Sequence, residues 1–275
     1  MRALLALALV VPLAASAQVD IHLAPFGSIG KSGIQADLAG FKSLAGDLGQ
    51  IMGPQLLGPG DTTGALGFDV GLALSVTNID ESREDWQKAV ASAPSTLQTF
   101  EVHVRKGLPY SVEVSGTVTH LLESDLWGVG MHLKYALLEG YRFIPDLALR
   151  TGVSTVLGSR EMSLLISSSD VTISKTFGAG GLLSITPFLG YGFTYVRAST
   201  YVIGFFPTSA PQPAKFVIEE GPNPDDPTET IDPNNIYRHR GLLGIRVASV
   251  HASLALELAI SDGIQTFTTR LGADF

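Results

Sequence analysis

The sequence predicts an all-β fold: a closed antiparallel transmembrane β-barrel of about ten strands, with twelve as the alternative, preceded by a short amphipathic helix. Three observations lead to it. Apolar residues alternate with small or polar ones through most of the chain after residue 62. Charged residues make up 16% of the 275 residues, against about 25% in soluble domains. Beyond the N-terminus, no stretch approaches the ~18 consecutive apolar residues of a transmembrane helix.

The N-terminus indicates export. Residues 1–17 contain Arg2, an apolar run over 3–13, and the small residues Ala15-Ser16-Ala17, which is the layout of a cleaved secretory signal peptide. The chain has no cysteine. An exported protein without disulfides depends on packing and hydrogen bonds for its stability.

Residues 18–62 form a separate N-terminal segment with a different period. Apolar residues recur every three or four positions from Ile34 to Met52, and Gly53-Pro54 ends the pattern, which predicts an amphipathic helix. Such a helix can plug the barrel, cap its periplasmic mouth or lie on the membrane. Its polar face has mixed charge, unlike a basic membrane-binding helix, so we expect a plug or a cap. That face carries Asp37, Lys42, Asp47 and Gln50.

Residues 63–275 contain the strands. Along 64–76 every second residue is apolar, from Leu66 to Val76, while the others are small or polar. In the sixth strand the alternation shifts phase near Ser168, which predicts a bulge or a split. The expected strands lie near 63–77, 97–107, 109–121, 125–138, 142–156, 162–176, 182–198, 236–248, 250–261 and 264–275.

Alternation alone does not separate a soluble sandwich from a membrane barrel. The expected strands have about 11 to 17 residues, which is long for soluble sheets and suited to a tilted bilayer crossing. Their polar faces are rich in Gly, Ala, Ser and Thr, as a crowded lumen allows. Aromatic residues near the strand ends predict two girdles. They are Tyr110, Tyr135 and Phe143 at one end, and Trp127, Tyr195 and Tyr237 at the other.

Loop lengths also favour a membrane barrel. The connections after even-numbered strands are short, whereas those after odd-numbered strands include the two longest, 78–96 and 199–235. Outer-membrane barrels have short periplasmic turns and longer outer loops in the same way. The acidic, proline-rich stretch 219–233 is expected to be a solvated outer loop.

With these features the chain resembles the outer-membrane β-barrel proteins of Gram-negative bacteria. The likeness covers the export signal, the strand pattern and the last strand. In that family a terminal aromatic residue, preceded by apolar residues at alternate positions, is the signal read by the barrel assembly machinery, and Phe267, Leu271 and Phe275 match it. The resemblance implies a location in the cell outer membrane, with outer-membrane lipid and the assembly machinery as partners. It implies no particular activity.

Strand parity places one set of charges in the lumen. Acids and bases nearly balance, so ion pairs that fill and stiffen a narrow interior are favoured over a selectivity ring. Arg238, Arg240 and Arg246 are the best candidates for an anion-attracting wall. The full set is Asp69, Glu101, Glu113, Asp146, Glu257 and Asp274 with Arg105, Lys134, Arg150, Arg238, Arg240, Arg246 and Arg270.

The expected function is a passive pore for small solutes or a structural barrel, with a narrow polar lumen and no enzymatic activity. We expect no cofactor and no metal, since cysteine is absent and the histidines lack ligand spacing. The net charge of -8 argues against nucleic acid as a partner. The alternative is a lipid- or peptide-processing enzyme with an active site at the rim, drawing on His120, His239, Asp80 or Glu81.

Overall fold

The computed structural model describes residues 19–30, 33–55, 58–180, 182–200, 221–222, 230–231 and 235–275. The expected signal peptide, 1–17, lies outside the described residues, as does most of the acidic stretch 219–233.

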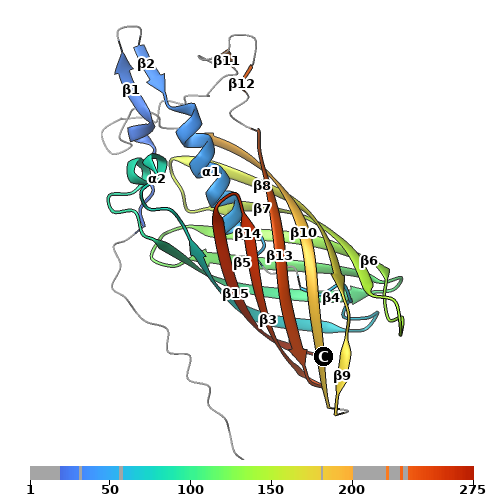
Figure 1. Ribbon diagram of the computed structural model, residues 1–275. Coiled ribbons are helices and arrows are strands. Elements are labelled where there is room, and N and C mark those ends of the chain that lie inside the picture. The colour runs from blue at the N-terminus through green and yellow to red at the C-terminus, as the bar shows by residue number, and fades with distance from the viewer. Residues whose placement is uncertain are drawn as a thin grey trace, which may run out of the picture.

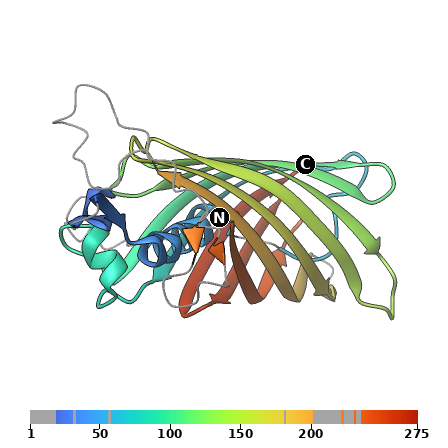
Figure 2. The ribbon, with the colours of Figure 1, turned by 90° about the horizontal axis from the view of Figure 1, so that it is seen from above.

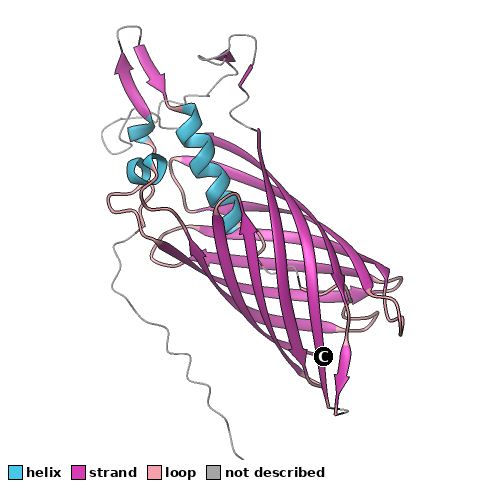
Figure 3. Ribbon diagram, viewed as in Figure 1, coloured by secondary structure: helices cyan, strands magenta, loops and turns pink. Residues whose placement is uncertain are grey.

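Ten long antiparallel strands form a closed ring (Figures 1 and 3). Neighbours in the chain are neighbours in the ring, and the last strand pairs with the first from Gln265↔Asn78 to Asp274↔Asp69. This confirms the barrel with ten strands. The short strand β9 (Phe177–Ala179) pairs only with the start of the strand that follows it. The ring consists of β3 (Phe68–Asn78), β4 (Thr96–Leu108), β5 (Val112–Leu121), β6 (Trp127–Leu138), β7 (Asp146–Leu157), β8 (Met162–Ser174), β10 (Leu183–Thr200), β13 (Asn235–Ala248), β14 (Ala252–Ser261) and β15 (Ile264–Asp274).

Each strand turns its apolar side chains outward. In β6 the exposed fraction is 71% for Met131 and 47% for Leu133, whereas His132 and Lys134 between them are buried inside. The same alternation recurs around the ring, which therefore presents an apolar outer surface without a free edge along its described strands. Such a surface is stable only in a bilayer. The protein is a transmembrane β-barrel located in the outer membrane.

Strand β8 corrects one expectation. Its alternation is unbroken from Met162 to Ser174, and its register with both neighbours is continuous, so the bulge expected near Ser168 is absent from β8. The registers break instead between Ala136 and Leu138, where β6 meets β7. Because β8 keeps its phase, Asp170 faces the lumen, a position that sequence parity did not give it.

The two ends of the barrel differ. At one end, called the short-turn end, the connections span 109–111, 139–145, 175–182 and 249–251. At the other, called the long-loop end, 79–95 and 201–234 are the longest of five connections. The 79–95 loop contains helix α2 (Glu84–Ala89). The short strands β11 (Gly221–Pro222) and β12 (Thr230–Ile231) pair with each other within the other long connection.

The N-terminal segment contains more structure than a single helix. It consists of a 3-10 turn, η1 (Ala24–Phe26), a hairpin of β1 (Gly27–Gly30) and β2 (Gly33–Ala36), and helix α1 (Leu38–Met52). The helix begins four residues later than expected, because Ile34 belongs to β2 and Asp37 caps the helix, accepting a hydrogen bond from the Gly40 N–H at 2.9 Å. No helix among the described residues is long and apolar enough to cross a membrane.

Helix α1 lies inside the barrel at the long-loop end (Figures 1 and 2). It contacts β4, β5, β8, β10 and β13, strands that come from all around the ring, and it also contacts α2. This arrangement brings the N-terminal segment and the lumen-facing side chains together in one site.

Candidate functional site

Apolar packing seats α1 in the mouth of the barrel. Leu44, Leu48 and Ile51 are fully buried on the helix. They form one cluster with buried apolar residues from the long-loop ends of the strands. The lumen is thus apolar at this end, because the inner positions that elsewhere carry polar residues here carry large aliphatic ones. The strand members of this cluster include Leu97, Leu121, Val156, Leu164, Ile166, Val196 and Ile236.

A buried carboxylate ties α1 to the rim. Asp47 is 1% exposed, and its oxygens lie 2.8 Å from Arg83 Nη1 and 3.7 Å from Arg238 Nη2. It also accepts a hydrogen bond from Trp86 Nε1 at 3.0 Å. Arg83 and Trp86 belong to the 79–95 loop and Arg238 to β13, so one side chain joins helix, loop and barrel wall.

Past α1, residues 53–55 and 58–63 lie in the lumen, and cations of the wall bind their oxygens. Arg240 Nη1 donates to the Pro54 carbonyl at 2.8 Å. Lys134 Nζ donates to the carbonyls of Pro59 at 2.7 Å and Asp61 at 2.6 Å. Arg246 forms an ion pair with the Asp61 carboxylate. The segment therefore presents oxygen acceptors to three cationic side chains.

The same segment also donates hydrogen bonds to hydroxyl and carboxylate oxygens of the wall. Its main-chain N–H groups bind Ser174 Oγ from Gly60 at 2.9 Å and Glu113 from Thr63 at 2.9 Å. The Thr62 N–H binds Glu139 at 2.5 Å. A backbone without helix or strand hydrogen bonds must find such partners when it is buried, and here the wall provides them.

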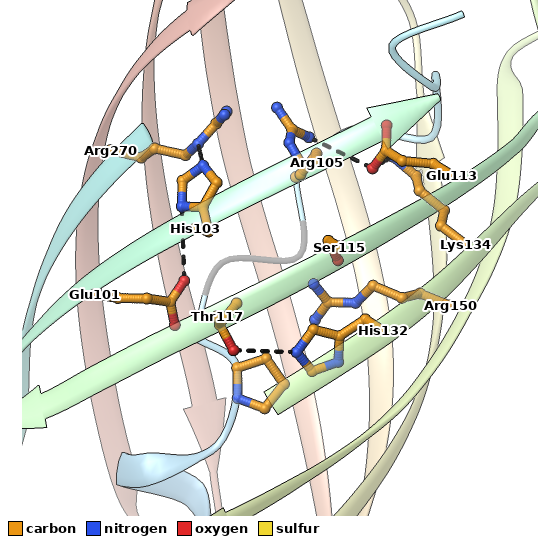
Figure 4. A pocket seen from close by; sticks show the side chains of 12 residues that line it. Glu101, His103, Arg105, Glu113, Ser115, Thr117, His132, Lys134, Arg150 and Arg270 are labelled. Atoms are coloured by element: carbon orange, nitrogen blue, oxygen red, sulfur yellow. Dashed lines mark hydrogen bonds and ion pairs between the residues drawn. The ribbon is translucent and has the colours of Figure 1, made fainter. Parts of the chain in front are cut away.

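Around the segment, the lumen charges form two clusters. In the first, Asp69 pairs with Arg270 and, at 2.9 Å, with Arg105 Nε. In the second, Asp170 lies 3.3 Å from both Arg150 and Arg240. Figure 4 shows how side chains of β4, β5, β6, β7 and β15 point into one space. Paired charges are what a lumen of this width tolerates.

That space is small. A cavity of about 30 Å³ lies between the N-terminal segment and the wall, with Pro54 and Gly58 on one side (Figure 4). This is room for water, not for a solute. Its wall carries four cations and two acids: Arg105, Lys134, Arg150, Arg270, Glu101 and Glu113.

The structure places the predicted lumen charges on the inner face, some in the clusters above and some apart. Asp146 accepts a hydrogen bond from the Gly140 N–H at 2.9 Å at the short-turn end. Glu257, on β14, is buried. Asp274 is the last residue of β15, beside Asp69 of β3.

The predicted girdle residues divide between strands and turns. Tyr110 and Phe143 lie in short connections, 92% and 86% exposed. Trp127, Tyr135, Tyr195 and Tyr237 lie on the outer face of strands. Of the predicted assembly residues, Phe267 and Leu271 face outward on β15, and Phe275 follows that strand.

The rim histidines do not come together. His120 on β5 stacks on Trp127 with ring centroids 4.2 Å apart, and Nδ1 of His239 on β13 lies 2.8 Å from the Tyr191 hydroxyl. Strands β5 and β13 are five places apart in a ring of ten, so these side chains lie on opposite sides of the barrel. Within the described ranges, no three His, Asp or Glu side chains gather as metal ligands would.

Several residues of the site escaped sequence reasoning. Asp61 and the carbonyls of Pro54 and Pro59 lie in a segment without periodicity, so no pattern marks them. Arg83 and Trp86 lie in a loop for which the sequence predicts only a large length. A charged residue with a tryptophan three positions later, in a loop next to an apolar helix, was the available signal.

Comparison with protein-family models and with curated proteins gives no match for this chain. Among solved structures it is similar to the KdgM porin in complex with disordered oligogalacturonate, at 9% identity and a TM-score of 0.35, covering 75% of this chain and 99% of that one. It is similar to Ail, the attachment invasion locus protein of Yersinia pestis, at 10% identity and a TM-score of 0.29, covering 77% of this chain and 99% of that one. It is also similar to LpxR from Salmonella typhimurium, at 11% identity and a TM-score of 0.33, covering 74% of this chain and 99% of that one. At such low identities and TM-scores these likenesses say nothing about activity.

Proposed function

We propose that this protein is a gated, narrow conduit of the outer membrane, held closed by residues 38–63, which we call the plug. One observation carries the proposal: past α1, the described residues of the plug occupy the lumen, where polar and charged side chains of the wall bind them. When the plug moves, the wall behind it can be hydrated, as in barrels that conduct.

The side chains that line the lumen favour a plug that can move over a lumen that is permanently filled. A ten-stranded barrel that served only as a scaffold could fill its interior with wall side chains. Here the wall instead binds residues from outside the ring, through the cations Lys134, Arg240 and Arg246. Past α1, this separate segment is bound by hydrogen bonds that water can replace.

The groups that hold the plug also suggest the class of solute. Lys134, Arg240 and Arg246 bind plug oxygens, and Nε of Arg240 and of Arg246 has no hydrogen-bond partner within the described structure. Once the plug leaves, these three cations lose the plug oxygens that they bind, which favours small anions on the open path. Of the three predicted wall arginines, Arg238 is engaged with Asp47 at the rim instead.

Conductance in planar bilayers tests the gate. The full chain is expected to conduct rarely, and deletion of residues 27–58 to raise the ion flux. In the full chain, the pair Gly49→Cys with Val196→Cys should form a disulfide that locks α1 to β10, because a Cβ at residue 49 lies 3.3 Å from the Val196 Cβ. Openings should disappear on oxidation and return on reduction. The single variant Val196→Cys is the control, and an absence of flux from both the full chain and the deletion would refute the pore.

Ion selectivity tests the solute class separately. Reversal potentials across a salt gradient are expected to show anion preference in the plug deletion. Lys134→Gln and Arg240→Gln should each reduce that preference. Arg197→Gln, on the exposed outer face of β10, is the matched control and should leave it unchanged.

The enzymatic alternative has weaker support. It would need His120, His239, Asp80 or Glu81 to act with neighbours of suitable chemistry. Among the hydrogen bonds described, the Asp80 carboxylate accepts only from Ser82 of its own turn, with the hydroxyl at 2.6 Å. Lipid or peptide turnover that His120→Ala or His239→Ala abolishes would revive it.

A further inference from the structure

The chain crosses the barrel an odd number of times. Ten strands form the wall, and the described residues 53–55 and 58–63 lie along one further passage through the lumen, which makes eleven. An odd number of crossings places the two ends of the described chain at opposite ends of the barrel. Residue 19 therefore lies at one end and Phe275 at the other.

Contacts fix the upstream residues at the long-loop end. The Val19 N–H donates to the Glu123 carbonyl, in the loop after β5, at 2.9 Å. The Leu23 N–H donates to the Glu161 carboxylate, in the loop after β7, at 2.5 Å. The buried side chains of Leu23 and Phe26 join the apolar cluster that holds α1.

Residues 19–26, which we call the strap, also bind the 79–95 loop. The His22 N–H donates to the Ala89 carbonyl, at the end of α2, at 2.8 Å. Residues 19–26 are thus bound to three of the five connections at the long-loop end. From there the hairpin of β1 and β2 extends beyond the barrel (Figure 1).

Contacts fix the downstream residues at the short-turn end. Thr62 binds Glu139, in the connection after β6. Phe68 and Phe275 exchange main-chain hydrogen bonds, with the Phe275 N–H donating at 2.8 Å and the Phe68 N–H at 2.9 Å. The first wall strand thus starts at the end where the last one finishes.

We propose that residues 19–36 are displayed on the outer face of the outer membrane, and that the chain reaches that face through the lumen of its own barrel. The orientation follows from the loops, because outer-membrane barrels keep their short turns in the periplasm. Anything attached upstream of residue 19 is displayed with the hairpin, so the barrel acts as a carrier for its own N-terminal segment. This inference does not depend on whether the lumen conducts.

Cysteine labelling in intact cells tests the topology, since the native chain has no cysteine. Three single variants are compared at exposed positions: Asp20→Cys in the strap, Glu81→Cys in the long-loop end and Val250→Cys in a short turn. The probe is a maleimide on a polyethylene glycol too large to pass through porins, read as a shift on a gel. Each variant is first shown to be folded by its changed mobility when unboiled.

The expected result is labelling of Asp20→Cys and Glu81→Cys in intact cells, with Val250→Cys labelled only after the outer membrane is permeabilised. Labelling of Glu81→Cys without Asp20→Cys would place the strap in the periplasm and overturn the inference. Labelling of Val250→Cys alone would reverse the barrel and overturn it equally. Neither labelling result measures conductance. A failure of the proposed display of residues 19–36 can therefore be distinguished from a failure of the proposed gated conduit.

Discussion

Gly49 of α1 lies directly against Val196 of β10, so that a side-chain carbon at residue 49 would stand 2.3 Å from the Val196 Cγ2. Helix and wall meet here without an intervening side chain. Glycine costs a helix about 1 kcal/mol relative to alanine, and this close contact is the physical reason for it at this position.

A larger residue at position 49 should therefore unseat the helix. Gly49→Leu is expected to cost about 1–3 kcal/mol of docking free energy through overpacking. The measurement is the emission of Trp86, fully buried beside α1, in a Trp127→Phe background that leaves it as the only tryptophan. A red shift is expected. Gly49→Ala should show a smaller shift that Val196→Ala reverses, and an unshifted Gly49→Leu spectrum would contradict the contact.

Loss of the rim carboxylate should have a comparable effect. Asp47→Ala leaves Arg83 and Arg238 without their shared partner, and breaking a buried pair costs about 3–5 kcal/mol. We expect the low end of that range, because both arginines keep some contact with water. The measurement is the urea midpoint of the Trp86 emission change. Glu84→Gln is the matched control, since its ion pair with Lys88 is exposed and contributes about 1 kcal/mol or less.

Acid should loosen the start of α1. Burial disfavours the charged form of Asp37, but hydrogen bonds from Lys88 and from the Gly40 N–H outweigh it and hold the pKa of Asp37 below its ordinary value of 3.8. A lowered pKa stabilises the folded state above the unfolded pKa, and the gain is lost as the pH falls through the folded value.

The cap and the charge can be separated by substitution. Asp37→Ala should cost about 1 kcal/mol at neutral pH, as expected for loss of an N-cap. Asp37→Asn should keep much of the cap but lose the part of the pH dependence that arises below pH 4. Trp86 emission between pH 6 and pH 3 in the three proteins measures this, and identical pH curves for the native chain and Asp37→Asn would rule out the assignment.

The terminal aromatic residue should matter for assembly more than for stability. The Phe275 side chain is 74% exposed on the outside, while its main chain makes the bonds to Phe68. Phe275→Ala is thus expected to lower the amount of folded barrel in cells several-fold, yet to refold from urea into detergent micelles like the native chain. Phe143→Ala, 86% exposed in a turn, is the control. Equal amounts of both variants in cells would argue against recognition of Phe275 by the assembly machinery.

Most of the wall could be predicted from the sequence, because the lipid and the lumen impose one rule on every second residue. The period of two identified all ten strands to within a few residues. The exception is Asp170: the run of serines in β8 predicts a change of phase, whereas the strand keeps its alternation and turns Asp170 into the lumen. Serine fits both faces of a strand, so it carries no information on register.

The contents of the lumen could be predicted only in part. The apolar period predicts α1, but it does not indicate that Asp47, on the polar face, is buried against three donors. The hairpin before the helix is too short to show a period. The carbonyls of Pro54, Pro59 and Asp61 bind through the backbone, and no side chain signals that role.

The passage through the lumen also constrains the order of folding. Helix α1 already contacts strands from all around the ring, so the hairpin and α1 cannot be drawn through the lumen together once they are folded and the ring is complete. The ring closes where β3 meets β15, between the strand that follows the plug and the last strand made. The N-terminal segment must therefore lie among the strands before β3 pairs with β15, and the barrel closes around it.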